Sequence, residues 1–170
     1  MNILVLNGSP RPNGNTATLC KAFAEEAAAR GHEVTVMPVG TMQIGACRGC
    51  EYCHTKGQGT CVQKDDMEQL YPLLQKAELL LFASPVHYFG FSGQMQSAIT
   101  RFYSFRHPAA KKCALLLSSF GENMYDSIVT QYRALLDAFE AEDLGILTFH
   151  GRGQRCEENM AKMRDFADTL

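Results

Sequence analysis

The protein has 170 residues, a length that suits one domain with a single substantial core. A hydrophobic fraction of 46% and a charged fraction of 20% are ordinary for a globular chain, so composition argues against a disordered or fibrous class. The formal net charge of −2, without a long run of Lys or Arg, argues against nucleic-acid binding. The apolar start from Met1 to Leu6 is too short for a signal sequence or a membrane span, and seven cysteines without a secretory segment favour a reducing compartment. We therefore expect a cytoplasmic protein that does not bind membranes.

Short apolar runs alternate with helical patterns along the chain. Ile3 to Leu6 is typical of a strand buried on both faces, and a loop rich in Gly, Pro and Asn leads from it to an Ala-rich helix over Thr16 to Arg30. The same order repeats, with strands expected at 33–38, 79–83, 113–118 and 145–149, and with helices expected at 66–76, 92–104, 126–141 and 157–170. Five strands that alternate with helices predict an α/β fold with a doubly wound parallel sheet.

In such sheets a ligand binds beyond the carboxyl ends of the strands, which directs attention to the loops after Asn7, Ala83 and Leu117. The first loop, Gly8 to Thr16, joins a strand to a helix, so its backbone N–H groups and the helix dipole converge on one place and favour a bound anion.

The side chains of Ser9, Arg11, Asn15 and Thr16 could complete that anion site. The loop lacks the Lys-Ser/Thr pair of a Walker A loop and the glycine spacing of a dinucleotide loop, so a phosphate monoester is the better hypothesis. The alternative is an ordinary polar loop in which Asn15 or Thr16 only caps the helix.

The second loop begins at Ser84 and carries aromatic side chains. Pro85 sets the direction in which the chain leaves the strand, and Val86, Tyr88 and Phe89 offer apolar surface that suits a planar ring. The alternative is that these aromatic residues belong to the core or to an interface.

Taken together, G-S-P-R-x-x-G-N-T in the first loop and S-P-V-H-Y-F-G followed by S-G-Q-M-Q in the second resemble the FMN phosphate loop and flavin-ring loop of the flavodoxin-like NAD(P)H-dependent FMN reductase family. The resemblance covers nearly the whole chain. It departs from the family at His87, where an aromatic residue is common, and at Gln96, where a Lys is common.

The resemblance implies a three-layer flavodoxin-like fold with strand order 2-1-3-4-5, formed by residues 1–170 as one domain. It implies FMN as cofactor, NAD(P)H as co-substrate, and a homodimer or a dimer of dimers. Residues of all three loops would bind FMN: Ser9, Arg11, Asn15, Thr16, Pro85, Val86, His87, Tyr88, Phe89, Gly90, Ser119 and Gly121.

The implied activity is NAD(P)H-dependent reduction of free flavin, a quinone or another small acceptor in a ping-pong cycle. No side chain is expected to be catalytic, because hydride passes from the nicotinamide to N5 of the flavin and the protein supplies position and electrostatics. The electron acceptor could be a small molecule or a redox protein.

Four cysteines lie in an insertion around residues 45–64. Cys47, Cys50, Cys53 and Cys61 follow a C-x2-C-x2-C-x7-C pattern that resembles a ferredoxin-type run, and iron–sulfur flavoproteins carry a compact cysteine run in this insertion. Apparent relatives without a cluster keep the same cysteines, so a [4Fe–4S] cluster, zinc and free thiols all stay open. An electron-transferring iron–sulfur flavoprotein is therefore the alternative function, and a flavin-free structural relative is a third.

Overall fold

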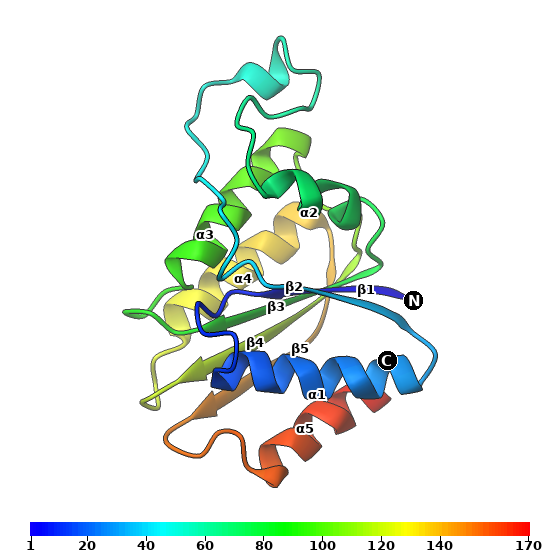
Figure 1. The fold of residues 1–170 in the computed structure, drawn as a ribbon, viewed down its shortest axis with the longest axis vertical. Helices are drawn as coiled ribbons and strands as arrows, with labels where there is room; N and C mark the ends of the chain where they lie inside the picture. Colours follow the sequence, from blue (N-terminus) through cyan, green and yellow to red (C-terminus); the bar gives the residue numbers. More distant parts are fainter.

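The computed structural model describes residues 1–170, and one five-stranded sheet forms its centre (Figure 1). The strands are β1 (Asn2–Asn7), β2 (Glu33–Met37), β3 (Leu79–Pro85), β4 (Lys112–Ser119) and β5 (Glu142–His150). All neighbouring strands are parallel, and their order across the sheet is β2-β1-β3-β4-β5. This order confirms the predicted doubly wound, flavodoxin-like fold.

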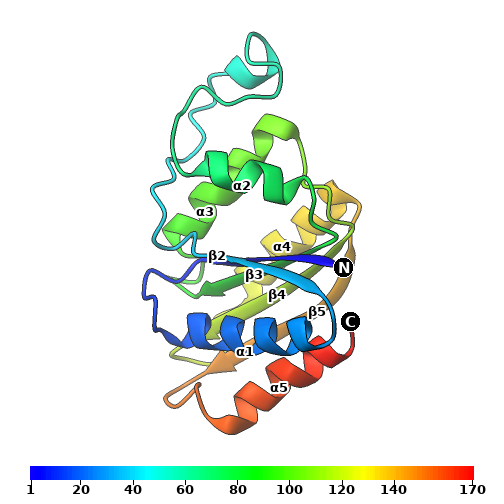
Figure 2. The same cartoon turned by 45° about the vertical axis from the view of Figure 1, so that its right-hand side comes forward.

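Helices cover both faces of the sheet and complete three layers (Figures 1 and 2). One face carries α1 (Asn15–Ala29) and α5 (Glu157–Asp168), and the other carries α2 (Met67–Leu74), α3 (Gly93–Thr100) and α4 (Asp126–Phe139). None of these helices is long and apolar enough to cross a membrane.

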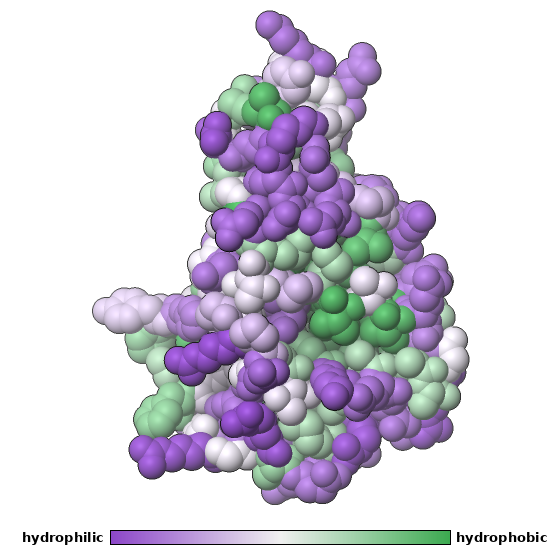
Figure 3. All heavy atoms as spheres, viewed as in Figure 1, coloured by the Kyte–Doolittle hydropathy of each residue, from purple (hydrophilic) through white to green (hydrophobic).

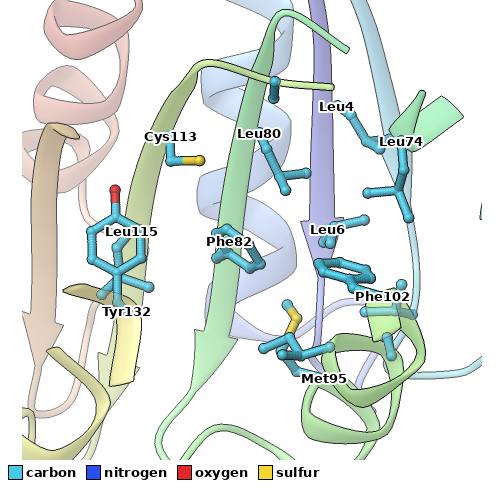
Figure 4. Packing of buried hydrophobic residues seen from close by; sticks show 14 of the residues in the cluster. Leu4, Leu6, Leu74, Leu80, Phe82, Met95, Phe102, Cys113, Leu115 and Tyr132 are labelled. Carbon is cyan, nitrogen blue, oxygen red and sulfur yellow. The ribbon is translucent and has the colours of Figure 1, made fainter. Parts of the chain in front are cut away.

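The two faces of the sheet have separate apolar cores. Leu4 and Leu6 of β1 point to the same side as Phe82 of β3 and pack there with residues of α2, α3 and α4, as Figure 4 shows. Ile3 and Val5 point to the opposite side and pack against α1 and α5. Successive side chains of a strand face opposite sides, so strands buried on both faces need continuous apolar runs, which is why the sequence pattern located them.

Several elements end at other residues than the sequence predicts. The expected helix 92–104 ends at Thr100 and continues as a 3₁₀ helix over Arg101–Phe105. Strand β3 extends through Pro85, which lies opposite Ser118 of β4 in the parallel register. Strand β5 begins at Glu142 rather than Gly145, and its register with β4 shifts between Cys113 and Leu115.

Between β2 and α2 the chain leaves the sheet as an arm, residues 40–66, which projects from the body of the molecule (Figures 1 and 2). Its only helical turn is a 3₁₀ helix, Tyr52–His54. The outer end of the arm is mostly hydrophilic in the space-filling view of Figure 3. The arm contains all four cysteines of the predicted insertion.

Candidate functional site

A cavity of about 700 Å³ lies at the carboxyl edge of the sheet. Its size is within the range of small-molecule and cofactor sites. The loops after β1, β3, β4 and β5 all contribute to its wall. The lining residues are Ser9, Pro10, Arg11, Pro12, Asn13, Gly14, Asn15, Thr16, Pro85, Val86, His87, Ser118, Ser119, Phe120, Gly151, Gln154 and Arg155.

The phosphate loop, Gly8 to Thr16, forms one end of the cavity. The Ser9 hydroxyl donates to the Arg11 carbonyl oxygen at 3.1 Å and accepts from the Arg11 N–H at 3.2 Å. Gly14 is the N-cap of α1 and supplies no side-chain cap, and the Thr16 hydroxyl is hydrogen-bonded to the hydroxyl of Ser118 at 2.7 Å. No side chain therefore caps the first-turn N–H groups of α1, so the alternative that Asn15 or Thr16 caps the helix is wrong. An uncapped helix start of this kind favours a bound anion.

Close backbone packing holds the phosphate loop in place. Gly8 N–H donates to the Ala83 carbonyl oxygen at 2.7 Å, and Gly40 N–H donates to that of Asn7 at 2.9 Å. A Cβ atom at Gly40 would lie only 2.1 Å from the carbonyl oxygen of Ser9, so this approach requires glycine. The loop is thus tied to β3 and to the segment after β2.

The ring loop, Ser84 to Ser92, contributes to the cavity only through its first half. Pro85, Val86 and His87 line the cavity, and backbone hydrogen bonds of 2.9 and 3.1 Å join His87 to Gly90.

At the tip of the ring loop, Tyr88 and Phe89 adopt positive φ angles of 50° and 65°, and their side chains are 94% and 52% exposed. Neither residue lines the cavity, and Gly90 does not line it either. The tip projects from the carboxyl edge of the sheet (Figure 1), so the aromatic surface predicted for a ring faces solvent in this chain.

The loop after β4 forms a further part of the wall. Ser119 lines the cavity, but its hydroxyl is already engaged with the Tyr125 hydroxyl at 2.6 Å. Gly121 does not line the cavity, whereas Ser118 and the 77% exposed Phe120 do. Neither Ser118 nor Phe120 is among the FMN-binding residues that the resemblance implies.

The segment between β5 and α5 supplies wall residues that the sequence analysis missed. Gln154 is buried, and its Nε2 donates to the carbonyl oxygens of Ser119 at 2.5 Å and Gly151 at 3.0 Å, while its Oε1 has no partner. Arg155 reaches the phosphate loop from the same segment. The predicted topology could have pointed to Gln154 and Arg155, because the loop after the fifth parallel strand must also lie at the carboxyl edge of the sheet.

The arm brings the four cysteines to the wall of one small cavity of about 20 Å³. Cys53 is buried there, and burial, followed by the neighbouring Cys61 and Cys47 thiols, raises the pKa of its thiol. Cys47 and Cys50 are exposed. No group of three or more Cys, His, Asp or Glu side chains is arranged to hold a metal ion, so the thiols as placed do not fit a metal centre.

Arg101 anchors the arm to the body of the protein. Its side chain has no exposed surface, and its Nη1 donates to Asp65 Oδ2 at 2.6 Å and to the Gly45 carbonyl oxygen at 2.9 Å. Its Nη2 donates to the Tyr71 hydroxyl at 3.2 Å. Burial opposes ionisation of Asp65, but hydrogen bonds from Arg101 and from backbone N–H groups outweigh it and hold the pKa of Asp65 below its usual value.

Related proteins share parts of the sequence. An iron–sulfur flavoprotein of Archaeoglobus fulgidus is 35% identical over 107 residues, which are 63% of this chain and 48% of that protein. An iron–sulfur flavoprotein of Methanosarcina thermophila is 29% identical over 101 residues, which are 59% of this chain and 52% of that protein. The chain thus spans about half the length of these curated relatives.

Solved structures share the fold over the whole chain. An NAD(P)H:quinone oxidoreductase from Methanothermobacter marburgensis superimposes with a TM-score of 0.79 at 17% identity, covering 100% of this chain and 96% of that one. An FMN-dependent NADH-azoreductase from Bacillus anthracis, in complex with FMN, gives a TM-score of 0.77 at 12% identity and covers 100% and 99%. At these identities the likeness shows the fold alone.

The family profile described as NADPH-dependent FMN reductase matches residues 1–150. This match spans both loops from which the resemblance was inferred and confirms that resemblance. The chain therefore belongs to the NADPH-dependent FMN reductase family.

Proposed function

We propose that the chain binds FMN in the cavity at the carboxyl edge and catalyses NAD(P)H-dependent reduction of free flavin, a quinone or another small acceptor. The observation that carries this proposal is the phosphate end of the cavity, where α1 begins without a capping side chain beneath a loop of small and polar residues. Family membership supports the same activity.

The residues that line the cavity support FMN as its ligand. The first-turn N–H groups of α1, with Ser9 and Arg11, would hold the phosphate. Val86 and Phe120 would offer apolar surface to the ring, and the unpartnered Gln154 Oε1 lies in the wall between the loops. FMN bound there would accept a hydride from the nicotinamide and pass electrons to the acceptor.

The polar groups of the wall support a role in binding and orientation rather than in proton transfer. The lining residues include no Asp, Glu, Cys, Lys or Tyr, and the ionisable side chains among them are one imidazole, that of His87, and two permanently charged guanidinium groups. This composition agrees with chemistry that is carried by the cofactor and needs no catalytic side chain.

The test combines binding with turnover. Apo-protein is titrated with FMN while flavin fluorescence is followed, and the loaded protein is then assayed for NADH and NADPH oxidation with free flavin and with a quinone. We expect saturable FMN binding and ping-pong kinetics. A protein that binds no FMN, or that binds FMN but turns over no acceptor, would refute the proposal.

Iron–sulfur electron transfer is the second candidate function, because all four cysteines of the arm line one cavity. The arm would have to rearrange to hold a cluster, since the thiols as placed form no metal-holding group. An absorbance spectrum and an iron and zinc analysis of anaerobically purified protein decide the matter. About four irons per chain would establish a cubane cluster, and metal-free protein would exclude it.

We further propose that the protein is a cytoplasmic homodimer. The exposed aromatic side chains of Tyr88, Phe89 and Phe120 lie in loops at the carboxyl edge, beside the cavity, where a second copy could cover them. All seven cysteines are unpaired, which agrees with a reducing compartment. Light scattering coupled to gel filtration tests the dimer, and a monomer at micromolar concentration would contradict it.

A further inference from the structure

We propose that Arg155 is a phosphate-binding residue of the cavity and that the β5–α5 segment, residues 151–156, is a fourth wall built to hold it there. The inference rests on the proposed function, because the phosphate in question is that of FMN. It assigns a binding role to a part of the chain that lies outside the three loops with motifs.

Arg155 lies against the phosphate loop. Its Nη1 donates to the carbonyl oxygen of Asn13 at 3.2 Å, and Asn13 directly precedes Gly14, the N-cap of α1. The guanidinium group therefore lies beside the uncapped helix start, and Arg155 itself lines the cavity. Of the lining residues only Arg11 carries a second permanent positive charge, and no acidic side chain lines the cavity.

Hydrogen bonds to the neighbouring loop fix the segment that carries Arg155. Gly151 N–H donates to the Phe120 carbonyl oxygen at 3.0 Å, and the buried Gln154 side chain donates to the Ser119 carbonyl oxygen at 2.5 Å. Asn159 of α5 donates to the Gln154 carbonyl oxygen at 3.1 Å. The backbone on the N-terminal side of Arg155 is thus tied to β4 and to α5.

Glycines shape the turn that makes these contacts possible. Gly151 and Gly153 have φ angles of 78° and 80°, a backbone conformation that residues other than glycine rarely adopt. The Arg155 side chain is exposed, and its hydrogen bond to the carbonyl oxygen of Asn13 places the guanidinium group at the phosphate loop.

The chemistry of guanidinium matches a phosphate monoester. A guanidinium group has five N–H donors in a planar fork that can engage two phosphate oxygens at once, and the contact with Asn13 uses only one of them. FMN and NADPH both carry a phosphate monoester. The place of Arg155 beside the start of α1 assigns it to the phosphate of FMN.

The experiment compares FMN with riboflavin, which lacks the phosphate. Dissociation constants of both ligands are measured by fluorescence titration of the apo forms of wild type, Arg155→Ala, Arg155→Lys and Arg152→Ala. Arg152 is an exposed arginine of the same segment that does not line the cavity, so its variant is the matched control.

We expect Arg155→Ala to weaken FMN binding by roughly ten- to a hundredfold, the effect of losing a hydrogen bond to a charged group, and to leave riboflavin binding unchanged. Arg155→Lys should recover part of the FMN affinity, because it keeps the charge but not the planar fork. Arg152→Ala should bind both ligands like wild type.

Two results for Arg155→Ala overturn the inference. Equal weakening of FMN and riboflavin binding by Arg155→Ala would mean a structural role, and no weakening would mean no role. Where FMN binding is unchanged, kcat/KM of the FMN-loaded variant is measured with NADPH and with NADH, and a lower preference for NADPH would assign Arg155 to the nicotinamide cofactor. Failure of wild type itself to bind FMN would refute the proposed function, and the inference would fall with it.

Discussion

Replacement of Arg101 by methionine should destabilise the protein strongly, because Arg101 holds the arm to the body from a fully buried position. The substitution keeps an unbranched side chain and removes the ion pair with Asp65 together with the hydrogen bonds to Gly45 and Tyr71. Asp65 is only 16% exposed in its side chain, so the carboxylate is left in a site that water reaches poorly.

The magnitude follows from what remains around that carboxylate. Removing one partner of a buried ion pair costs about 3–5 kcal/mol. Asp65 would keep two backbone donors, the N–H groups of Gly45 at 3.0 Å and Met67 at 3.1 Å, so we expect the lower end of that range. With a urea dependence of about 2 kcal/mol per M for a domain of this size, the unfolding midpoint should fall by about 1.5 M.

Urea unfolding followed by circular dichroism measures this shift, and hydrogen exchange of residues 40–66 shows whether the arm loosens first. Lys64→Met is the control, because Lys64 makes only an exposed ion pair with Glu68 and should cost less than about 1 kcal/mol. The double variant Asp65→Asn/Arg101→Met should be more stable than Arg101→Met alone, since it removes the isolated charge. A midpoint shift no larger than that of the control would refute the reasoning.

Three further predictions concern acid stability, backbone packing and thiol reactivity. The hydrogen bonds that Asp65 accepts outweigh burial and lower its pKa in the folded protein. The ionised carboxylate therefore stabilises the fold fully above about pH 4, the pKa of Asp in the unfolded chain, and this stabilisation is lost as the pH falls through the lower pKa of the folded state. Urea midpoints measured against pH should therefore fall less steeply below pH 4 for Asp65→Asn than for wild type, and parallel curves would contradict this. Gly40→Ala should abolish FMN binding, because its Cβ would lie 2.1 Å from a carbonyl oxygen of the phosphate loop, whereas Gly93→Ala, whose Cβ meets nothing within 4 Å, should bind like wild type. Equal affinities of the two variants in the fluorescence titration would show the contact to be unimportant. Burial raises the pKa of Cys20 and of Cys113 to about 12, so a thiol reagent should leave both thiols unmodified in the native protein. Mass spectrometry measures the modification, and a thiol that reacts as fast in the native protein as in urea would contradict this prediction.

Much of the fold could be predicted from the sequence, because its determinants are local. The apolar runs such as Ile3 to Leu6 and Leu79 to Ala83 identified strands buried on both faces, and their alternation with helices predicted the sheet. Helix and strand ends were less predictable where tertiary contacts decide them. Pro85 extends β3 because Ser118 lies opposite it, and no local pattern carries that information.

The candidate site also has parts that the sequence predicts and parts that depend on tertiary structure. The grouping of Ser9, Arg11, Asn15 and Thr16 at the cavity was predictable, because these residues lie close together in one loop. Their contact with a phosphate stays a prediction. The ring loop was predictable only in part, since the positive φ angles of Tyr88 and Phe89 turn its aromatic tip toward solvent. Their contact with FMN stays a prediction.

By itself, the sequence determined the strand and helix order, the place of the phosphate loop and the family, because these depend on periodicity and on motifs within short stretches of chain. Only the tertiary structure decided that Arg155 meets the phosphate loop across 142 residues and that Arg101 binds the arm at Asp65. A guanidinium group binds whichever partner the fold places beside it. Sheet register and loop closure decide which distant residues meet, and the spacing of residues along the chain does not reveal these contacts.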